Sequence, residues 1–346
     1  MSKKILTVIG ARPQFIKAAP VSRALKAAGL DERIIHTGQH FDADMSDIFF
    51  DELRIPKPAH HLSVSGGGHG DMTGRMMQGL EPVFLQEKPD WALVYGDTNS
   101  TLAGALVAAK LHVPVVHVEA GLRSFNKRMP EEVNRILTDH VSALLLCPTQ
   151  IAIDNLRKEG ITQGVHHVGD VMYDAVLESR EFSRAKPDIL AGFGVQEGRY
   201  ALATLHRAEN TDRRERLEAM LDFLRQRTTS GLSVLLPMHP RTRQKIAEFG
   251  LSTAGITVCD PVGYLDMARL LSACAEVLTD SGGVQKEAYF HRKPCITLRD
   301  ETEWVETISH GWNRLWTTAT YMARKDISDY GDGRSAARIA TLIQAA

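Results

Sequence analysis

The sequence predicts an α/β fold with two Rossmann-like, doubly wound domains in tandem, on three observations. Short apolar runs alternate with segments of helical periodicity along the chain. The clearest stretch, from Trp91 to Glu119, has the order strand, helix, strand, which makes the two strands parallel. The alternation stops in a segment rich in Lys, Pro and Gly at 183–198 and then begins again. A cleft between the two domains is the expected site.

We place the first domain at residues 1–170. Its expected strands are 4–9, 34–37, 91–95, 113–118, 143–147 and 165–168. Its expected helices are 15–28, 45–53, 72–86, 100–110, 130–142 and 151–159. A glycine-rich stretch at 65–70 is expected to form a loop, either over a site or as a plain connector.

We place the second domain at residues 171–325 and a terminal segment at 326–346. The expected strands of this domain are 200–205, 233–238, 256–259 and 276–279. The expected helices between them are 213–227, 242–249 and 264–273.

Composition excludes several classes of protein. The chain has 346 residues, 43% of them hydrophobic and 24% charged, with a formal net charge of -1, which is typical of a soluble two-domain protein and favours neither nucleic acid nor anionic membrane as a partner. No apolar run approaches the ~18 residues of a membrane helix, and the run after Lys4 is too short for a signal peptide. The four cysteines are widely spaced, so we expect buried thiols in a reducing cytoplasm, with neither disulfides nor a metal site.

Acidic residues follow two neighbouring strands of the first domain. Asp97 comes after one strand, Glu119 after the next, and Glu131 opens the helix that follows. Ligands bind outside the carboxyl ends of parallel strands in open α/β sheets, so we interpret these three as acid-base candidates. Asp97 is also typical of a helix cap, and Glu131 with Glu132 is typical of any first helical turn.

The turn after the first strand, Gly10 to Gln14, leads into a helix and is therefore a candidate anion site, with Arg12 and Lys17 adding positive charge. The turn matches neither a Walker loop nor Gly-x-Gly-x-x-Gly, and a plain surface turn is the alternative.

The second domain carries groups suited to a diphosphate. Ser281-Gly282-Gly283 follows a strand and opens a helix. Because these residues are small, the first amides of the helix are accessible to an anion. Other strand ends carry His206-Arg207 and His239-Pro240-Arg241, and Arg299 lies further along the chain. An ordinary turn and solvated surface arginines are the alternative.

Taken together, these motifs resemble the non-hydrolysing UDP-N-acetylglucosamine 2-epimerase family over essentially the whole chain. The matching segments, in order, are Gly10-Ala11-Arg12-Pro13, Gly96-Asp97-Thr98, His117 to Arg123, Pro130-Glu131-Glu132, Asp280-Ser281-Gly282-Gly283 and Tyr330-Gly331-Asp332-Gly333. The resemblance implies a GT-B-like fold, as in two-domain nucleotide-sugar glycosyltransferases. It also implies a terminal helix near 334–343 that returns to the first domain, and a homodimer.

The resemblance also implies roles for residues. Asp97, Glu119 and Glu131 would be the acid-base groups, with His206 near the leaving group and Lys17 supporting the cluster. The UDP part of the substrate would be held by Arg12, His206, Arg207, His239, Ser281, Gly282, Gly283, Glu287 and Arg299. No dinucleotide fingerprint precedes a helix, so we expect no cofactor and an elimination route through a glycal.

Two departures from the family pattern concern the substrate and its regulation. Thr302-Glu303-Trp304-Val305-Glu306 stands where the plain branch has Thr-Glu-Arg-Pro-Glu, which resembles the branch acting on UDP-2,3-diacetamido-2,3-dideoxyglucuronate. Gln39-His40 is followed by Phe41-Asp42-Ala43-Asp44 in place of the glutamines that bacterial members use in an allosteric UDP-N-acetylglucosamine site. The alternative activities are a hydrolysing 2-epimerase, a GT-B glycosyltransferase and a non-catalytic UDP-sugar sensor.

Overall fold

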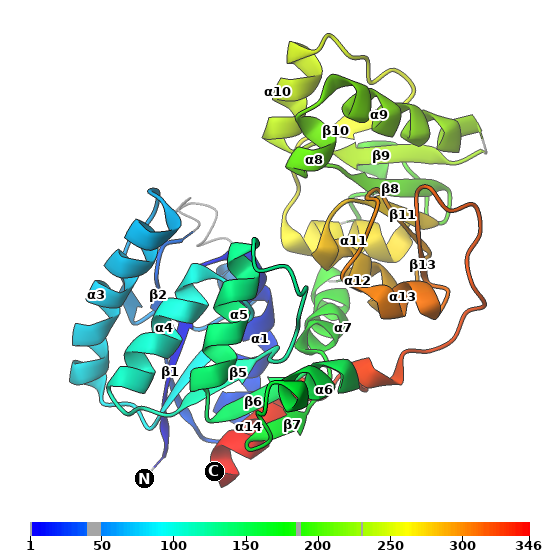
Figure 1. Ribbon diagram of the computed structural model, residues 1–346. Coiled ribbons are helices and arrows are strands. Elements are labelled where there is room, and N and C mark those ends of the chain that lie inside the picture. The colour runs from blue at the N-terminus through cyan, green and yellow to red at the C-terminus, as the bar shows by residue number, and fades with distance from the viewer. Residues whose placement is uncertain (1, 40–49, 185–187, 230) are drawn as a thin grey trace. The chain divides into compact units, whose positions relative to one another are not determined.

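The computed structural model describes residues 2–39, 50–184, 188–229 and 231–346. The chain divides into two compact units (Figure 1). The first unit comprises Met1–Ala175 and Ser328–Ala346, and the second comprises Val176–Ile327. Each unit holds one parallel sheet with helices on both faces. The predicted α/β class with two doubly wound domains is therefore confirmed.

The sheet of the first unit has seven parallel strands in the order β3-β2-β1-β4-β5-β6-β7. Its strands are β1 (Lys4–Ile9), β2 (Asp31–His36), β3 (His60–His61), β4 (Trp91–Tyr95), β5 (Val115–Val118), β6 (Leu144–Cys147) and β7 (Val165–His167). The strand order changes direction between β1 and β4, and such switch points are where open α/β sheets bind ligands. The loops after β1, β4 and β5 therefore meet at this edge.

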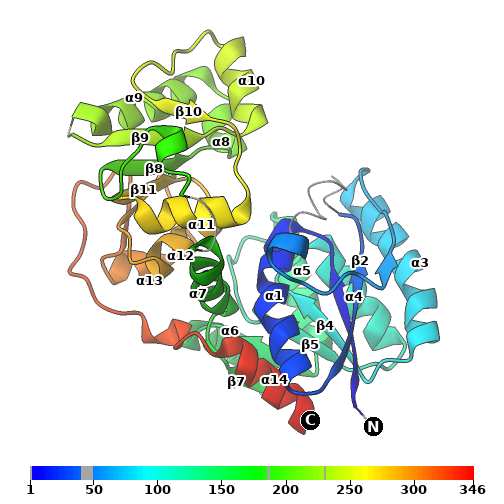
Figure 2. The same cartoon turned by 180° about the vertical axis from the view of Figure 1, so that it is seen from behind.

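Helices cover both faces of the first sheet. They are α1 (Arg12–Ala27), α3 (His69–Glu87), α4 (Asn99–Lys110), α5 (Pro130–Val141), α6 (Gln150–Lys158) and α14 (Ser335–Ala345). Helices α3, α4 and α5 lie on one face, and α1 and α14 lie on the other (Figures 1 and 2). Met76, Leu80 and Phe84 of α3 are buried in one cluster with Val8 and Val94 of the sheet, which fixes α3 to its face. The predicted helix 45–53 lies mostly outside the described residues.

The carboxyl-terminal helix α14 belongs to the first unit and packs against α1. Its amino end has no capping side chain of its own. The carboxylate of Asp174 instead accepts hydrogen bonds from the amides of Ser335 at 3.2 Å and Ala336 at 2.9 Å. These bonds satisfy amides that the helix leaves without an internal partner, so Asp174 anchors the end of the chain.

The sheet of the second unit has six parallel strands in the order β10-β9-β8-β11-β12-β13. Its strands are β8 (Tyr200–Thr204), β9 (Ser233–Pro237), β10 (Thr257–Cys259), β11 (Glu276–Thr279), β12 (Cys295–Thr297) and β13 (Asn313–Leu315). The sequence analysis did not predict β12 and β13, which have three residues each. The switch point of this sheet lies between β8 and β11, so the loops after these two strands meet at its ligand edge.

The helical segments that follow β7 are α7 (Val171–Arg184), η1 (Ala191–Phe193), α8 (Ala208–Thr211), α9 (Arg214–Thr229), α10 (Pro240–Glu248), α11 (Tyr264–Ala273), α12 (Gly282–Phe290) and α13 (Val305–Ser309). Two buried clusters, one on each face of the second sheet, hold α9, α10, α11 and α12 to the strands. The sequence analysis took 183–198 as a linker, but α7 extends to Arg184 and η1 forms within that segment. Among the described residues, no helix combines the length and the apolar composition that a membrane span requires.

His291, directly after α12, makes the stability of the second unit depend on pH. Its side chain is buried, neither ring nitrogen has a hydrogen-bond partner among the described residues, and burial, with Arg180 and Lys293 nearby, lowers its pKa from 6.5 to about 3. Below pH 6.5, His291 therefore binds a proton in the unfolded chain before it does so in the folded chain. The contribution of His291 to the free energy of unfolding is complete above pH 6.5 and falls as the pH falls, by about 2 kcal/mol at about pH 5.

Urea unfolding of wild type and His291→Leu between about pH 7 and pH 5 measures this effect. Leucine has no ionisable group, and replacing His291 with it removes no hydrogen bond. The variant should therefore lose less stability than wild type on acidification. Equal losses of stability in both proteins would contradict the conclusion that His291 causes the pH dependence.

Candidate functional site

The loops after β4 and β5 bring Glu119 and Lys17 together in the first unit. Tyr95 pairs with Val118 in the parallel register, so Gly96 and Glu119 follow side by side. Both have positive φ, +63° at Gly96 and +73° at Glu119. A carboxylate-bearing residue in this conformation is uncommon and is typical of functional sites. The Glu119 carboxylate forms an ion pair with the Lys17 ammonium from α1, and both side chains are largely buried.

Gly96 makes room for this ion pair. A Cβ atom at Gly96 would lie 3.3 Å from Glu119 Oε2 and 3.7 Å from Lys17 Nζ, so the pair packs directly over the glycine. The positive φ and the close approach together explain why glycine stands at this position.

Asp97 is held by α5 through Arg135. The guanidinium of Arg135 donates to Asp97 Oδ2 from Nε at 3.0 Å and from Nη2 at 2.7 Å, and it donates from Nη1 to Glu132 at 2.7 Å. Asn134 also donates to the Asp97 carbonyl at 2.8 Å. Asp97 is therefore fixed through its main chain and its side chain, with the carboxylate still a third exposed.

Glu132 anchors this arrangement from a buried position. Burial alone would raise its pKa, but the amides of Ser124 and Phe125 and the charge of Arg135 outweigh burial and lower the pKa below its usual range. The two amides donate at 2.9 Å and 2.8 Å. Glu132 thus stays ionised and holds both Arg135 and the loop after β5.

The turn after β1 is less open to an anion than its sequence predicts. Gln14 Oε1 accepts hydrogen bonds from the amides of Gly10 at 2.8 Å and Ala11 at 3.1 Å. A Cβ atom at Gly10 would lie 1.9 Å from Thr37 Oγ1, so only glycine fits there. Arg12 is exposed at the first turn of α1. The chain therefore uses two amides of this turn internally, and Arg12 is its exposed cation.

In the second unit, buried Asp280 organises the loop after β8. Its carboxylate accepts hydrogen bonds from the amides of His206 and Arg207, each at 2.9 Å, and from Asn210 Nδ2 at 3.1 Å. Burial would raise the pKa of Asp280, but His206, the Arg207 amide and Asn210 together lower it. His206 Nδ1 lies 3.2 Å from the same carboxylate, which fixes the ring.

His239 lies beside His206, with ring centroids 5.9 Å apart. Burial lowers the pKa of His239, and the neighbouring charges of His206 and Arg241 lower it further. The lowered pKa favours the neutral form of the His239 imidazole. Arg241 pairs with the exposed Asp212 at 2.6 Å.

The amino end of α12 is already adjacent to a carboxylate. Ser281 caps the helix, accepting from the Val284 amide at 3.5 Å. A Cβ atom at Gly282 would lie 2.4 Å from Glu303 Oε1, so this carboxylate packs against the first turn, where the helix dipole favours negative charge. Arg299 donates to Glu303 at 2.8 Å and to Glu209 at 3.1 Å.

The structure thus places most of the candidate residues in four groups. In the first unit, Lys17 lies with Glu119, and Asp97 lies with Arg135 and Glu132. In the second unit, His206 and Arg207 belong to the loop held by Asp280, with His239 beside His206. The remaining candidates of the second unit lie on or beside α12: Ser281, Gly282, Gly283, Glu287 and Arg299. Glu131 is exposed at the first turn of α5, next to Glu132.

Sequence reasoning missed Glu132, Arg135 and Asp280 as organising residues. Glu132 and Arg135 are three residues apart, which places them on one face of α5, and that spacing was a usable signal. Asp280 was part of a quoted motif without a role. Among the described residues, no group of three or more His, Cys, Asp or Glu side chains is arranged to hold a metal ion.

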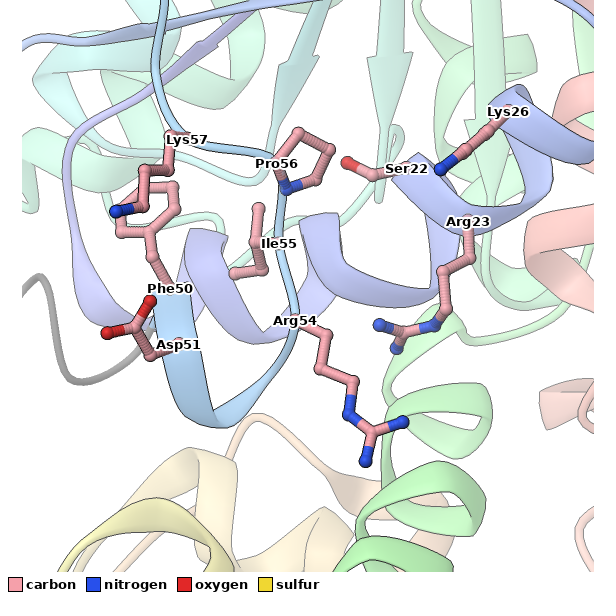
Figure 3. Close-up of a pocket in the computed structure, with 9 residues that line it drawn as sticks. All are labelled: Ser22, Arg23, Lys26, Phe50, Asp51, Arg54, Ile55, Pro56 and Lys57. Atoms are coloured by element: carbon pink, nitrogen blue, oxygen red, sulfur yellow. The ribbon is translucent and has the colours of Figure 1, made fainter.

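A surface hollow of about 450 Å³ lies elsewhere in the first unit (Figure 3). It is lined by Ser22, Arg23, Lys26, Phe50, Asp51, Arg54, Ile55, Pro56 and Lys57. None of the candidate site residues lines it, and the Arg23 side chain is bonded to the Leu53 carbonyl at 2.7 Å. The hollow is therefore separate from the groups described above.

Residues 23–344 match the protein family described as UDP-N-acetylglucosamine 2-epimerase. A Pseudomonas aeruginosa protein named UDP-2,3-diacetamido-2,3-dideoxy-D-glucuronate 2-epimerase is 55% identical over 353 residues, which cover 97% of this chain and 98% of that protein. The crystal structure of the Methanocaldococcus jannaschii UDP-GlcNAc 2-epimerase in complex with UDP-GlcNAc and UDP has a TM-score of 0.87 at 41% identity, with 100% of both chains covered. That of the Neisseria meningitidis enzyme bound to UDP-GlcNAc has a TM-score of 0.88 at 29% identity, covering 99% of this chain and 100% of that one. These similarities confirm the resemblance drawn from the sequence motifs.

The hydrogen bonds to Asp280 generate a prediction about stability. Replacing Asp280 with Asn removes the charge that three donors share and turns one acceptor atom into a donor, so the free energy of unfolding should fall by about 2–3 kcal/mol. Urea unfolding monitored by circular dichroism measures the loss. Asp260→Asn is the matched control, because Asp260 is 91% exposed and its single ion pair lies at the surface. Equal effects of the two substitutions would contradict the organising role of Asp280.

Proposed function

Because the chain belongs to the UDP-N-acetylglucosamine 2-epimerase family, we propose that it inverts carbon 2 of a UDP-N-acetylhexosamine without hydrolysing it. The observation that carries the proposal is the pair of charged groups at the ends of β4 and β5. There Glu119 is paired with Lys17 and Asp97 is held by Arg135. Carboxylates fixed beside cations at the ligand edge of a sheet suit proton transfer.

The reaction we propose is an elimination followed by a re-addition. A carboxylate takes the proton from C2, the C2–H electron pair forms a double bond to C1, and the bond from C1 to the diphosphate oxygen breaks. UDP leaves with the electron pair of the broken C1–O bond, and a glycal remains. A diphosphate oxygen then bonds to C1 again while a proton is delivered to C2 from the other face.

In this proposal the first unit supplies the acid and base groups. Asp97, Glu119 and Glu131 are the proton carriers, and Lys17 stabilises the Glu119 carboxylate. Each such group typically contributes 10²- to 10⁴-fold to a rate. The uncommon backbone conformation of Glu119 supports its role, because strained backbone of this kind is concentrated at functional sites, where the surrounding structure holds it in place.

The second unit binds UDP in this proposal. Ser281, Gly282 and Gly283 receive the diphosphate at the start of α12, the two glycines through their amides, and Glu287 binds the ribose hydroxyls. His206, Arg207 and His239 act at the leaving group, and Arg12 and Arg299 add positive charge. Arg299 is paired with Glu303 and Glu209, so a diphosphate that binds Arg299 must displace a carboxylate.

For the sugar itself, we propose UDP-2,3-diacetamido-2,3-dideoxyglucuronate. Support comes from the 55% identity to the relative of that name. Further support comes from Trp304, which stands where the plain branch has arginine and packs against the Lys286 ammonium at 4.1 Å from the ring centroid. Replacing a cation with an indole at this position changes which substituents of the sugar the site can bind.

We propose further that the enzyme works as a cytoplasmic homodimer. Val133 and Leu137 of α5 are one helical turn apart and are 40% and 43% exposed, and Leu85 of α3 is 57% exposed. Apolar side chains exposed on helices of one face suit a subunit interface. Cys147, Cys259, Cys274 and Cys295 are free, which suits a reducing compartment.

Isotope exchange tests the reaction directly. When the enzyme turns over in D₂O, deuterium should enter C2 of the recovered sugar nucleotide, and free UDP should not accumulate. Glu119→Gln should lower this exchange by about 10²- to 10⁴-fold, because glutamine cannot carry the proton, while UDP binding measured by calorimetry stays near the wild-type value.

Glu81→Gln serves as the control, because Glu81 is exposed on α3 and belongs to none of the charged groups described above. Near-normal exchange in Glu119→Gln would remove Glu119 from the mechanism. Release of free UDP in proportion to free sugar would identify a hydrolysing enzyme instead.

A comparison of substrates tests the choice of sugar. We expect kcat/KM for UDP-2,3-diacetamido-2,3-dideoxyglucuronate to exceed that for UDP-N-acetylglucosamine by at least about 10²-fold, because polar groups built to bind the extra substituents are left unpaired without them. Equal values, or a preference for UDP-N-acetylglucosamine, would reject this substrate while leaving the 2-epimerase reaction intact.

A further inference from the structure

A buried histidine lies under the loop that presents Asp97. His117, on β5, is fully buried, and its two ring nitrogens bond to two different groups. Nε2 lies 2.7 Å from the Gly96 carbonyl oxygen, and Nδ1 lies 2.6 Å from Asp139 Oδ1. The ring therefore connects the end of β4 to the buried side of α5.

The chemistry of its two partners determines the protons on this ring. A backbone carbonyl oxygen can only accept a hydrogen bond, so Nε2 must carry a hydrogen. An ionised carboxylate also only accepts, so Nδ1 must carry a hydrogen as well. Both nitrogens donate only in the imidazolium form, so His117 is a cation if Asp139 is ionised.

The surroundings of Asp139 keep it ionised. Its second oxygen accepts from Arg123 Nη1 at 2.7 Å and from the Gly121 amide at 3.1 Å. Arg123 in turn donates to both oxygens of Glu159 at 2.8 Å, so the four charges balance in sign.

One more titratable group lies within reach of the Asp139 charge. Burial and the Asp139 charge raise the pKa of the Cys147 thiol to about 12, so it remains neutral. Among the described residues, Asp139 contacts the imidazole directly, Arg123 and Glu159 follow beyond it, and His140 Nε2 lies 3.7 Å from Glu159.

The Gly96 carbonyl that His117 holds lies within the candidate site. The Gly96 amide donates to the Val118 carbonyl at 3.0 Å, so β5 holds both polar groups of this glycine. The Glu119–Lys17 pair packs over Gly96, and Asp97 follows it in the chain. A shift of Gly96 would move Asp97 and Glu119 relative to each other.

We propose that His117 is an imidazolium that acts as a positioning residue: it fixes the Gly96 carbonyl and so sets the placement of Asp97 against Glu119. The inference rests on the proposed function for its effect on the reaction, and on hydrogen-bond geometry alone for the charge of the ring. His117 does not itself touch the reacting atoms in this scheme.

Two substitutions separate the two bonds of the ring. The amide nitrogen of glutamine takes the place of Nε2 and donates to the Gly96 carbonyl, whereas that of asparagine takes the place of Nδ1 and reaches Asp139 only. We expect His117→Asn to lower kcat for C2 exchange by about 10²-fold with little change in KM, because the reacting groups are misplaced. His117→Gln should restore kcat to within about 10-fold of wild type.

Both variants should keep the wild-type affinity for UDP, because the bonds they change lie in the first unit. Their activities are compared at a temperature at which circular dichroism shows both variants to be folded. Exchange near the wild-type rate in His117→Asn, or an equal loss in both variants, would overturn the positioning role.

Nitrogen NMR of protein labelled in its histidines tests the charge without any substrate. The signal that disappears in His117→Asn is that of His117, and both of its ring nitrogens should show protonated-type shifts in the folded protein at about pH 7, because each donates a hydrogen bond. A lone-pair shift on either nitrogen would overturn the imidazolium. If wild type exchanges no C2 hydrogen in any UDP-sugar, the proposed function fails while this measurement still decides the protonation of His117.

Discussion

The parallel register of β4 and β5 is the constraint on which the first-unit site depends. Pairing of Tyr95 with Val118 makes the two strands end together, so that Gly96 and Glu119 leave the sheet side by side. Both residues then turn with positive φ, which ends the ladder and directs the Glu119 side chain to Lys17. A slip of one residue would reverse the faces of the apolar side chains on β4 and β5, so the core cluster that holds Val94 and Val115 fixes the site as well.

Both units use a buried aspartate to hold the loop at the ligand edge of the sheet. In the first unit Asp139 accepts from the Gly121 amide and contacts His117. In the second, Asp280 accepts from the amides of His206 and Arg207 and contacts the His206 ring. An ionised carboxylate is stable in a buried place only when several donors surround it. Each loop therefore has little freedom to take another shape without leaving a charge unpaired.

The sequence predicted the elements with strong apolar signals. The strand 91–95 and the strand 276–279 have the predicted bounds, because each is an apolar run that ends at Gly or Asp. Strands β12 and β13 are too short for a periodic signal. Helix α7 was not predicted at all, because the segment after residue 169 was interpreted as a connection that leads into the linker.

The candidate site was predictable only in part. Glu119 was predicted because a bare carboxylate after an apolar strand is uncommon. The inward face of α5 was not, because Glu132, Arg135 and Asp139 recur at helical spacing but are charged, and periodicity arguments take the charged face of a helix as solvated. Here that stripe faces the ends of β4 and β5, and only the packing of the whole unit determines this. Fold and family could therefore be predicted from local patterns, whereas the hydrogen-bond network could not.

The carboxylate of Glu303 at the start of α12 has a consequence for selectivity. It is attached to the chain only a few residues from Arg299, so its effective concentration at that guanidinium and at the helix end is on the order of millimolar or above. A small free anion such as inorganic phosphate must compete with it by mass action. In the proposed function, UDP has additional points of attachment and would gain the same advantage that the tethered carboxylate has, so the arrangement would favour the nucleotide over abundant simple anions.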